Sequence, residues 1–322
     1  VLDEFRGPAF SSGVVDSTNG YRERTLTLPN LFRQFSGFVL GGGRGVNGLR
    51  ECEFDPTVCN KGFNYAVSGA IMSEVPEHAR RLVAGLGDLR TARVPKVITI
   101  FMGGNDVCCQ CSAIIDVVGN NLCSREGATA QSWAVSMRET LQILKDNLEN
   151  TIVNLIGMFD VTGFQEVSGF FCNQTLPFFC PCAFLPEISQ AFGVPLPPGI
   201  TREFINTNLV VPLIDAYNQE SQSIADELSG PMFEVIYHPL GRDFTIPKNP
   251  DGTFNRNSLS IDCFHFSHST HASLATTLWN SMMRVDKPTD LENEIQCPST
   301  RYIPTRLNEN GTKCPFTRKP HQ

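Results

Sequence analysis

Apolar residues along the chain form short uncharged runs that alternate with longer amphipathic stretches. Runs of β-branched and aromatic residues predict buried strands at residues 97–102, 152–159 and 233–237, with a weaker candidate at residues 62–67. Apolar residues that recur every three or four positions predict helices at residues 73–86, 132–148, 207–228 and 268–285. Because strands alternate with helices, the sequence predicts an α/β fold built on a parallel sheet.

Residues 164–199 interrupt this alternation. The segment contains three cysteines, six prolines and many phenylalanines. Two interpretations stay open: a disulfide-tied loop that packs its own aromatic side chains, and a cap over an apolar substrate channel. The sequence after Lys287 is rich in proline and polar residues, and we expect it to wrap the surface. We therefore predict one domain over residues 1–286, with an insertion at about 164–199, and a tail over residues 287–322.

Length and charge narrow the class of protein. The 322 residues suffice for a large core, and 41% of them are hydrophobic, which excludes a wholly disordered chain. The net charge of −7 argues against a nucleic-acid partner, because phosphate-binding surfaces are basic. No apolar run reaches the roughly 18 residues of a membrane-spanning helix, so we expect no transmembrane segment.

The cysteines indicate an oxidising compartment. Twelve cysteines, several in tight clusters, are typical of a secreted chain that forms disulfides. A zinc site at the Cys-x-x-Cys run of residues 108–111 is the alternative, although no second ligand pair follows at the spacing of zinc sites. Glycosylation sequons at Asn173 and Asn310 agree with a secreted or secretory-lumen location. The disulfide candidates, whose pairing the sequence does not give, are Cys52, Cys59, Cys108, Cys111, Cys172, Cys180, Cys182, Cys263 and Cys297.

A polar run follows the clearest strand, where open α/β sheets place their chemistry. Two glycines at residues 103–104 let the backbone turn sharply, and Asn105 then presents a side-chain amide at the strand tip. Such an amide can stabilise a developing oxyanion. The alternative is a Gly-Asn-Asp turn that serves backbone geometry alone.

Two further positions carry candidate chemistry. Asp262 precedes His265 by three residues, a spacing at which a carboxylate can orient an imidazole that accepts a proton. Gly69 lies where a strand candidate meets a helix candidate, and its backbone N–H is a second possible oxyanion donor. The competing interpretations are a solvated loop for the Asp-His pair and tight packing for the glycine.

Four segments stand in a recognisable order: TLPN at residues 27–30, NYAVSGA at 64–70, ITIFMGGNDVCCQC at 98–111 and DCFHFS at 262–267. They resemble blocks of the SGNH (GDSL-type) serine hydrolases, and within these the phospholipase B-like branch. The resemblance extends from about residue 5 to about residue 300.

This resemblance implies a three-layer α/β/α sandwich around a parallel sheet of about five strands. It implies that Gly69 and Asn105 donate to the oxyanion, that His265 is the general base and acid, and that Asp262 orients it. The implied reaction is hydrolysis of phospholipids or other acyl esters through an acyl-enzyme, without a metal or other cofactor.

The family's nucleophile block is missing from the sequence. In the family, the serine belongs to a Gly-Asp-Ser block at the end of the first strand, and no Gly-Asp-Ser occurs here. Ser17 follows an Asp, but only two apolar residues precede that pair, which is too short for a central strand. We therefore expect the block to precede Val1, on a companion fragment from the same precursor. An internal strand left empty would leave buried polar groups unpaired, at about 1–3 kcal/mol each.

Three functional classes stay open at this point. The first is a secreted phospholipase B-like ester hydrolase whose Ser-His-Asp triad takes its serine from a separate N-terminal segment. The second is a catalytically inactive protein of the same fold that serves as a structural or binding component of an extracellular assembly. The third is catalysis by Ser17 itself, or an ordinary single-chain enzyme of which this sequence is only a part.

Overall fold

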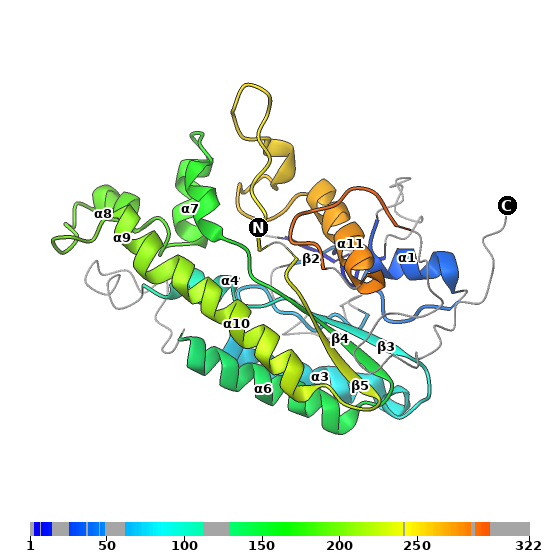
Figure 1. Cartoon of the computed structure of the whole chain (residues 1–322). Coiled ribbons are helices and arrows are strands. Elements are labelled where there is room, and N and C mark those ends of the chain that lie inside the picture. The colour runs from blue at the N-terminus through cyan, green and yellow to red at the C-terminus, as the bar shows by residue number, and fades with distance from the viewer. Residues whose placement is uncertain are drawn as a thin grey trace.

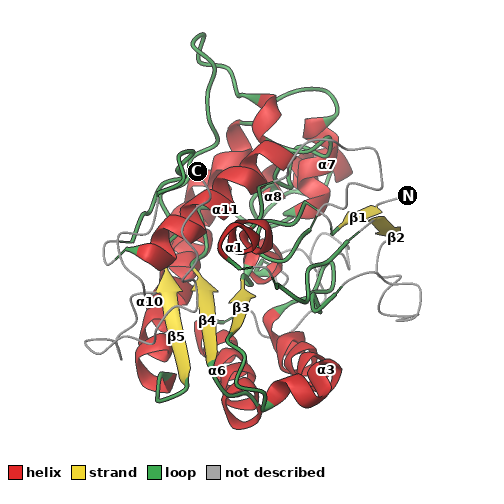
Figure 2. Ribbon diagram, turned by 90° about the vertical axis from the view of Figure 1, so that its right-hand side faces the viewer, coloured by secondary structure: helices red, strands yellow, loops and turns green. Residues whose placement is uncertain are grey.

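A parallel sheet lies at the centre of the fold. The computed structural model describes residues 3–6, 8–14, 26–36, 38–44, 46–48, 62–111, 129–240, 242–284 and 287–296. Within these residues the sheet has three strands in the order β3-β4-β5 (Figure 2). They are β3 (Lys96–Ile100), β4 (Thr151–Ile156) and β5 (Phe233–His238). Both pairings are parallel, so the three stronger strand predictions and the α/β class are confirmed.

Helices cover both faces of this sheet (Figure 1). One face carries α3, α6 and α10, and the other carries α1 and α11. Adjacent residues of β4 face opposite layers: Leu155 belongs to the core under α3, α6 and α10, whereas Ile156 belongs to the core under α11. The expected three-layer α/β/α arrangement is therefore confirmed. The bounds are α1 (Leu28–Phe35), α3 (Val75–Leu86), α6 (Ala130–Asn147), α10 (Val211–Leu228) and α11 (His268–Met283).

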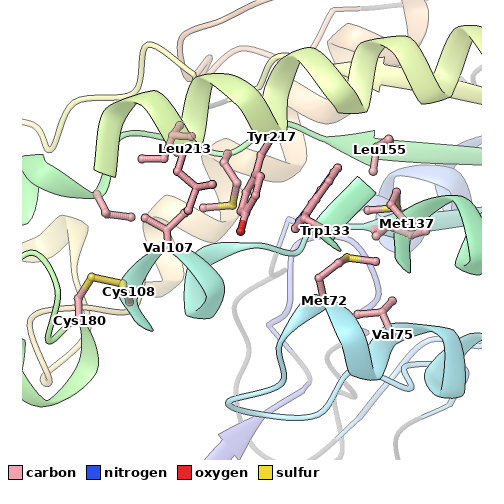
Figure 3. Close-up of a cluster of buried hydrophobic side chains, with 14 of the residues drawn as sticks. Met72, Val75, Val107, Cys108, Trp133, Met137, Leu155, Cys180, Leu213 and Tyr217 are labelled. Atoms are coloured by element: carbon pink, nitrogen blue, oxygen red, sulfur yellow. A yellow bond between two sulfur atoms is a disulfide. The ribbon is translucent and has the colours of Figure 1, made fainter. Parts of the chain in front are cut away.

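Each layer has its own aromatic centre. In the larger core, Trp133 stacks on Tyr217 with ring centroids 4.9 Å apart, between α10 and α3 (Figure 3). In the smaller core, Trp279 of α11 is fully buried, and Phe32 and Phe35 of α1 pack against its ring. Aromatic side chains that bury a large area thus fix the helices to the sheet on both sides.

Short polar residues determine where several helices begin. The side chains of Thr27, Thr129 and Ser267 each accept a hydrogen bond from a backbone N–H in the first turn of α1, α6 and α11. The helix α10 begins later than predicted, because α9 (Arg202–Ile205) and a π-helical turn, η8 (Asn206–Val210), precede it. In the described part of the chain, no helix has the length and apolar character needed to cross a bilayer.

Smaller elements connect these layers. An antiparallel pair, β1 (Asp3–Phe5) with β2 (Val46–Gly48), lies outside the main sheet. The remaining short helices are η3 (Met72–Glu74), η4 (Gly87–Arg90), α4 (Gly104–Cys109), η7 (Val161–Glu166) and η9 (Arg256–Ser258).

The weaker strand prediction, residues 62–67, is wrong. The segment is a turn followed by irregular backbone. Gly62 has a positive φ of 58°, which starts the turn. The guanidinium of Arg6 lies within 3.5 Å of the carbonyls of Asn64 and Ala66, which are thereby satisfied by a side chain instead of a neighbouring strand.

The insertion at residues 164–199 is mainly helical. It contains α7 (Cys172–Phe179) and α8 (Leu185–Phe192), which follow η7. Its three cysteines bond to cysteines outside the segment, in the disulfides Cys108–Cys180, Cys111–Cys182 and Cys172–Cys263. The insertion is therefore fastened both to α4 and to the loop before α11.

The first residues of the C-terminal segment pack along α11. The indole nitrogen of Trp279 donates to the carbonyl of Gln296 at 3.1 Å. The side-chain amide of Asn280 donates to the carboxylate of Glu292 at 2.6 Å. Residues 287–296 are thus bound to the buried middle of that helix.

Candidate active site

Asp262 and His265 form a hydrogen-bonded pair. The Nδ1 atom of His265 lies 2.7 Å from Oδ2 of Asp262. The other carboxylate oxygen accepts bonds from the backbone N–H groups of Phe264, at 3.0 Å, and of His265, at 2.9 Å. Cys263, between them, has a left-handed φ of 64°, which folds the chain back over the carboxylate. A turn of four residues therefore builds the pair.

The carboxylate of this pair is held ionised, while the ring stays open to solvent. Burial alone would raise the pKa of Asp262, but the hydrogen bonds from the His265 ring and from two backbone N–H groups outweigh it. The pKa of Asp262 lies well below its ordinary value as a result. The side chain of Asp262 is only 16% exposed, whereas that of His265 is 61% exposed. With Nδ1 bound to the carboxylate, Nε2 is the nitrogen that can meet a reactant.

The loop that carries this pair is anchored at both ends. The backbone N–H of Ser260 donates to the carbonyl of His265 at 2.7 Å, which closes the loop on itself. Two residues later, Ser267 caps α11. The pair is thus mounted directly on the N-terminal end of a buried helix.

The helix α7 supports the pair from the side. The disulfide Cys172–Cys263 brings the two Cα atoms to 5.4 Å. The hydroxyl of Thr175 donates to the carbonyl of Asp262 at 2.8 Å. The ring of Phe179 lies edge-on to the His265 ring at 5.1 Å. Sequence reasoning missed this role of α7, because the cysteine pairing that reveals it joins residues 91 positions apart.

Asn105 and Gly69 lie on adjoining loops. Asn105 is the second residue of α4, which follows Gly103 and its positive φ of 125°. Its side-chain amide donates to the carbonyl of Ala70 at 2.8 Å. Gly69 is exposed and has a positive φ of 75°, which accounts for glycine at this position. The amide that was expected to donate to an oxyanion thus also holds the glycine loop.

Asp106 fixes the same two loops together, a role that the sequence analysis missed. Both of its carboxylate oxygens lie 3.1 Å from the backbone nitrogen of Met72. The side chain of Asp106 is buried. Burial of Tyr217, and then the charge of Asp106, raise the pKa of the Tyr217 phenol. The Gly-Asn-Asp run is therefore more than a turn, because each polar side chain in it binds the neighbouring loop.

A row of aromatic rings connects the Asn105 loop to the Asp-His loop. Phe101, which follows β3, lies 6.2 Å from Phe159, which comes after β4. Phe159 in turn lies 5.1 Å from Phe266, the residue after His265. The segments that carry the candidate residues are thus linked through rings that follow the carboxyl ends of β3 and β4, where chemistry in open α/β sheets is found.

This geometry has a counterpart among known families. The family model for GDSL-like Lipase/Acylhydrolase matches residues 15–278. The chain belongs to this family. It is 26% identical to the mouse protein "Phospholipase B1, membrane-associated" and 27% identical to the human protein of that name. These matches cover 96% and 93% of the chain but only 20% and 19% of the relatives. The chain therefore spans about a fifth of the length of these relatives.

Several predicted site residues of this family member lie outside the described residues. They are the nucleophile candidate Ser17, the sequon residue Asn310, and the disulfide candidates Cys52, Cys59 and Cys297. Asn173 is described, and it is exposed at the start of α7. Cys108 and Cys111 are both in disulfides, so they do not supply the thiolates that a zinc site needs.

Proposed function

We propose that this chain is part of a secreted phospholipase B-like hydrolase of acyl esters, of the lipase or lysophospholipase type. The observation that carries the proposal is the Asp262–His265 pair, whose bonded carboxylate is shielded and whose ring is exposed. Residues 1–286 form the catalytic domain, with the insertion at about 164–199, and residues 287–322 form the tail. No cofactor takes part in the proposed reaction.

The pair serves as a proton relay in this reaction. Nε2 of His265 accepts the hydroxyl proton of a serine while the serine oxygen bonds to the ester carbonyl carbon. The same proton then passes to the departing alcohol as the ester bond breaks and the acyl-serine forms. Water repeats the sequence on the acyl-serine, which releases the fatty acid and restores the serine. Asp262 keeps the ring tautomer and stabilises the imidazolium between these steps.

Asn105 and Gly69 supply the oxyanion donors in this proposal. A side-chain amide carries two N–H bonds, of which one goes to the carbonyl of Ala70. The second is the donor that we assign to the oxyanion, together with the backbone N–H of Gly69. Because Asn105 and Asp106 bind the glycine loop, these donors are fixed before a substrate arrives, as oxyanion stabilisation requires.

We assign the nucleophile to a companion segment from the same precursor. The sequence contains no Gly-Asp-Ser block. Among the described strands, β3 is at the edge of the sheet, and Val97 in it is 36% exposed. A strand added to that edge would end beside Asn105 and could present its serine there. Ser17 is the competing source of the nucleophile.

Three disulfides support a secreted or secretory-lumen location, because such bonds persist in oxidising compartments. In this setting we assign Asn173 and Asn310 as glycosylation sites. The proposed partners are a phospholipid or other acyl-ester substrate and the companion segment.

Labelling with a fluorophosphonate tests this assignment. The full precursor is expressed with His265→Ala or, as a matched control, with His268→Ala, which removes an exposed histidine three residues away. We expect label on a fragment that precedes Val1, lost with His265→Ala and kept with His268→Ala. Label on this chain assigns the nucleophile to Ser17 or another internal serine. No label in the unaltered precursor supports the inactive, structural alternative.

A further inference from the structure

Four large apolar side chains are exposed next to the Asp262–His265 pair. Phe170 is 85% exposed and Ile261 is 86% exposed, and Phe171 and Phe178 are 48% and 60% exposed. We call these four residues the phenylalanine face. Side chains of this size are seldom left in water as a group unless the group binds something.

The phenylalanine face is continuous with the pair itself. Ile261 directly precedes Asp262 in the chain. Phe171 is the residue before Cys172, so the disulfide from Cys172 to Cys263 brings it close to the Asp-His turn. The Phe178 ring lies 5.5 Å from Phe179, whose ring contacts His265.

The helical geometry of α7 places these rings on the catalytic side. Phe171 and Phe178 are seven positions apart, or two turns, so they lie on one side of the helix. Thr175, which binds the carbonyl of Asp262, lies between them and the buried side of α7. Asn173 is two positions from Phe171, about 200° around the helix, so a glycan there would project away from Phe171 and Phe178.

The charge around this face selects one kind of partner. Residues 167–186 contain no charged side chain. The charges at its border are opposite in sign: the Asp262 carboxylate, which is bonded to His265, and the Arg256 guanidinium, which lies 3.6 Å from the sulfur of Cys172 and 3.7 Å from that of Cys263. The whole chain carries a net charge of −7, so an anionic surface would repel it. An uncharged apolar face on an acidic protein fits a zwitterionic phospholipid surface.

We propose that the phenylalanine face docks on a zwitterionic phospholipid surface and places the Asp262–His265 pair at its lipid boundary. The proposal rests on the proposed function, because a phospholipid substrate gives the face its reason to lie beside the pair. A second copy of the chain is a poorer occupant. Four side chains supply at most a few hundred Å², less than the roughly 800 Å² per partner of a stable interface.

Vesicle sedimentation tests the docking. All proteins carry His265→Ala so that the vesicles stay intact. The altered protein also carries Phe170→Ser, Phe171→Ser and Phe178→Ser, and the control carries Phe38→Ser and Val135→Ser, which remove exposed apolar side chains outside the face. With phosphatidylcholine vesicles, we expect the altered protein to bind at least tenfold more weakly than the parent, and the control to bind like the parent. Added phosphatidylserine should weaken binding of the parent.

Equal binding by the altered protein, or a requirement for phosphatidylserine, would overturn the proposal. So would a parent that forms a dimer which the three substitutions dissociate. Activity assays with proteins that keep His265 test the proposed function separately from the docking. The ratio of vesicle hydrolysis to hydrolysis of a soluble short-chain ester should fall at least tenfold with the three substitutions. If the unaltered enzyme hydrolyses neither ester yet binds vesicles, the proposed function fails and the docking stands.

Discussion

The disulfide Cys172–Cys263 should contribute to both stability and catalysis. Comparing its removal with the removal of a second disulfide separates the effect on stability from the effect on catalysis. This first disulfide joins α7 to Cys263, which lies between Asp262 and His265 of the proposed site, across 91 positions of sequence. Chain-entropy arguments give about 4–5 kcal/mol for a loop of this length. For a protein of this size, that loss lowers the melting temperature by on the order of 10 °C.

The disulfide Cys111–Cys182 offers a matched control. It spans 71 positions, but Cys108–Cys180 closes almost the same loop. Removing Cys111–Cys182 alone therefore frees only the few residues between the two bonds. The same relation gives about 2 kcal/mol for such a short loop.

The comparison uses two double variants of the full-length enzyme, Cys172→Ala with Cys263→Ala and Cys111→Ala with Cys182→Ala. Calorimetry should show about twice the stability loss in the first. At a temperature well below both transitions, kcat for a soluble ester should fall at least tenfold only in the first, because the turn that holds Asp262 loses its tie to α7. Equal stability losses, or an unchanged kcat in the first variant, would refute this reasoning.

Three further outcomes follow from the site. Asp262→Asn should lower kcat on the order of 10⁴-fold with little change in KM, because the carboxylate that fixes the tautomer of the His265 ring is lost. Retained activity in a single-turnover assay would contradict the role of the pair. Asn105→Ala should lower kcat about 10²–10³-fold, and unchanged acylation rates would remove it from the oxyanion site. The ring of His271 packs on Phe10, and burial, then the charges of His268 and His265, lower its pKa to about 4. The unfolded chain, with an ordinary histidine pKa near 6.5, then binds the extra proton first as the pH falls from about 6.5 to 4, so folding stability should fall by on the order of 3 kcal/mol across that window. Urea unfolding should show a smaller loss in His271→Gln, and an equal loss would exclude His271 as its source.

Local patterns predicted the layers of the fold. The predicted segments agree with the structure for three strands and four helices, namely β3, β4, β5, α3, α6, α10 and α11. In each of them the spacing of apolar residues reflects which side chains are buried against the sheet. The prediction at residues 62–67 failed for a non-local reason. Arg6, nearly sixty positions away, binds the carbonyls that a strand would have used.

The candidate site also divides into features that local sequence predicts and features that depend on non-local contacts. The pairing of Asp262 with His265 follows from three residues of separation and a turn, so the sequence could predict it. The support from Cys172, Thr175 and Phe179 could not be predicted, because it depends on which cysteines pair. The bond from Asn105 to the carbonyl of Ala70 could not be predicted either, because it depends on how two segments meet in space.

The placement of the three disulfides described above also bears on how a substrate would reach the proposed site. A single bond would let the insertion rotate about it. One bond to α4, one to Cys111 just after that helix and one to the loop before α11 fasten it at separated points. We therefore expect α7 to stay in place instead of hinging open like a lid. The enzyme should then reach its steady rate without a lag when it meets lipid, and the contour of α7 should set which acyl chains are accepted.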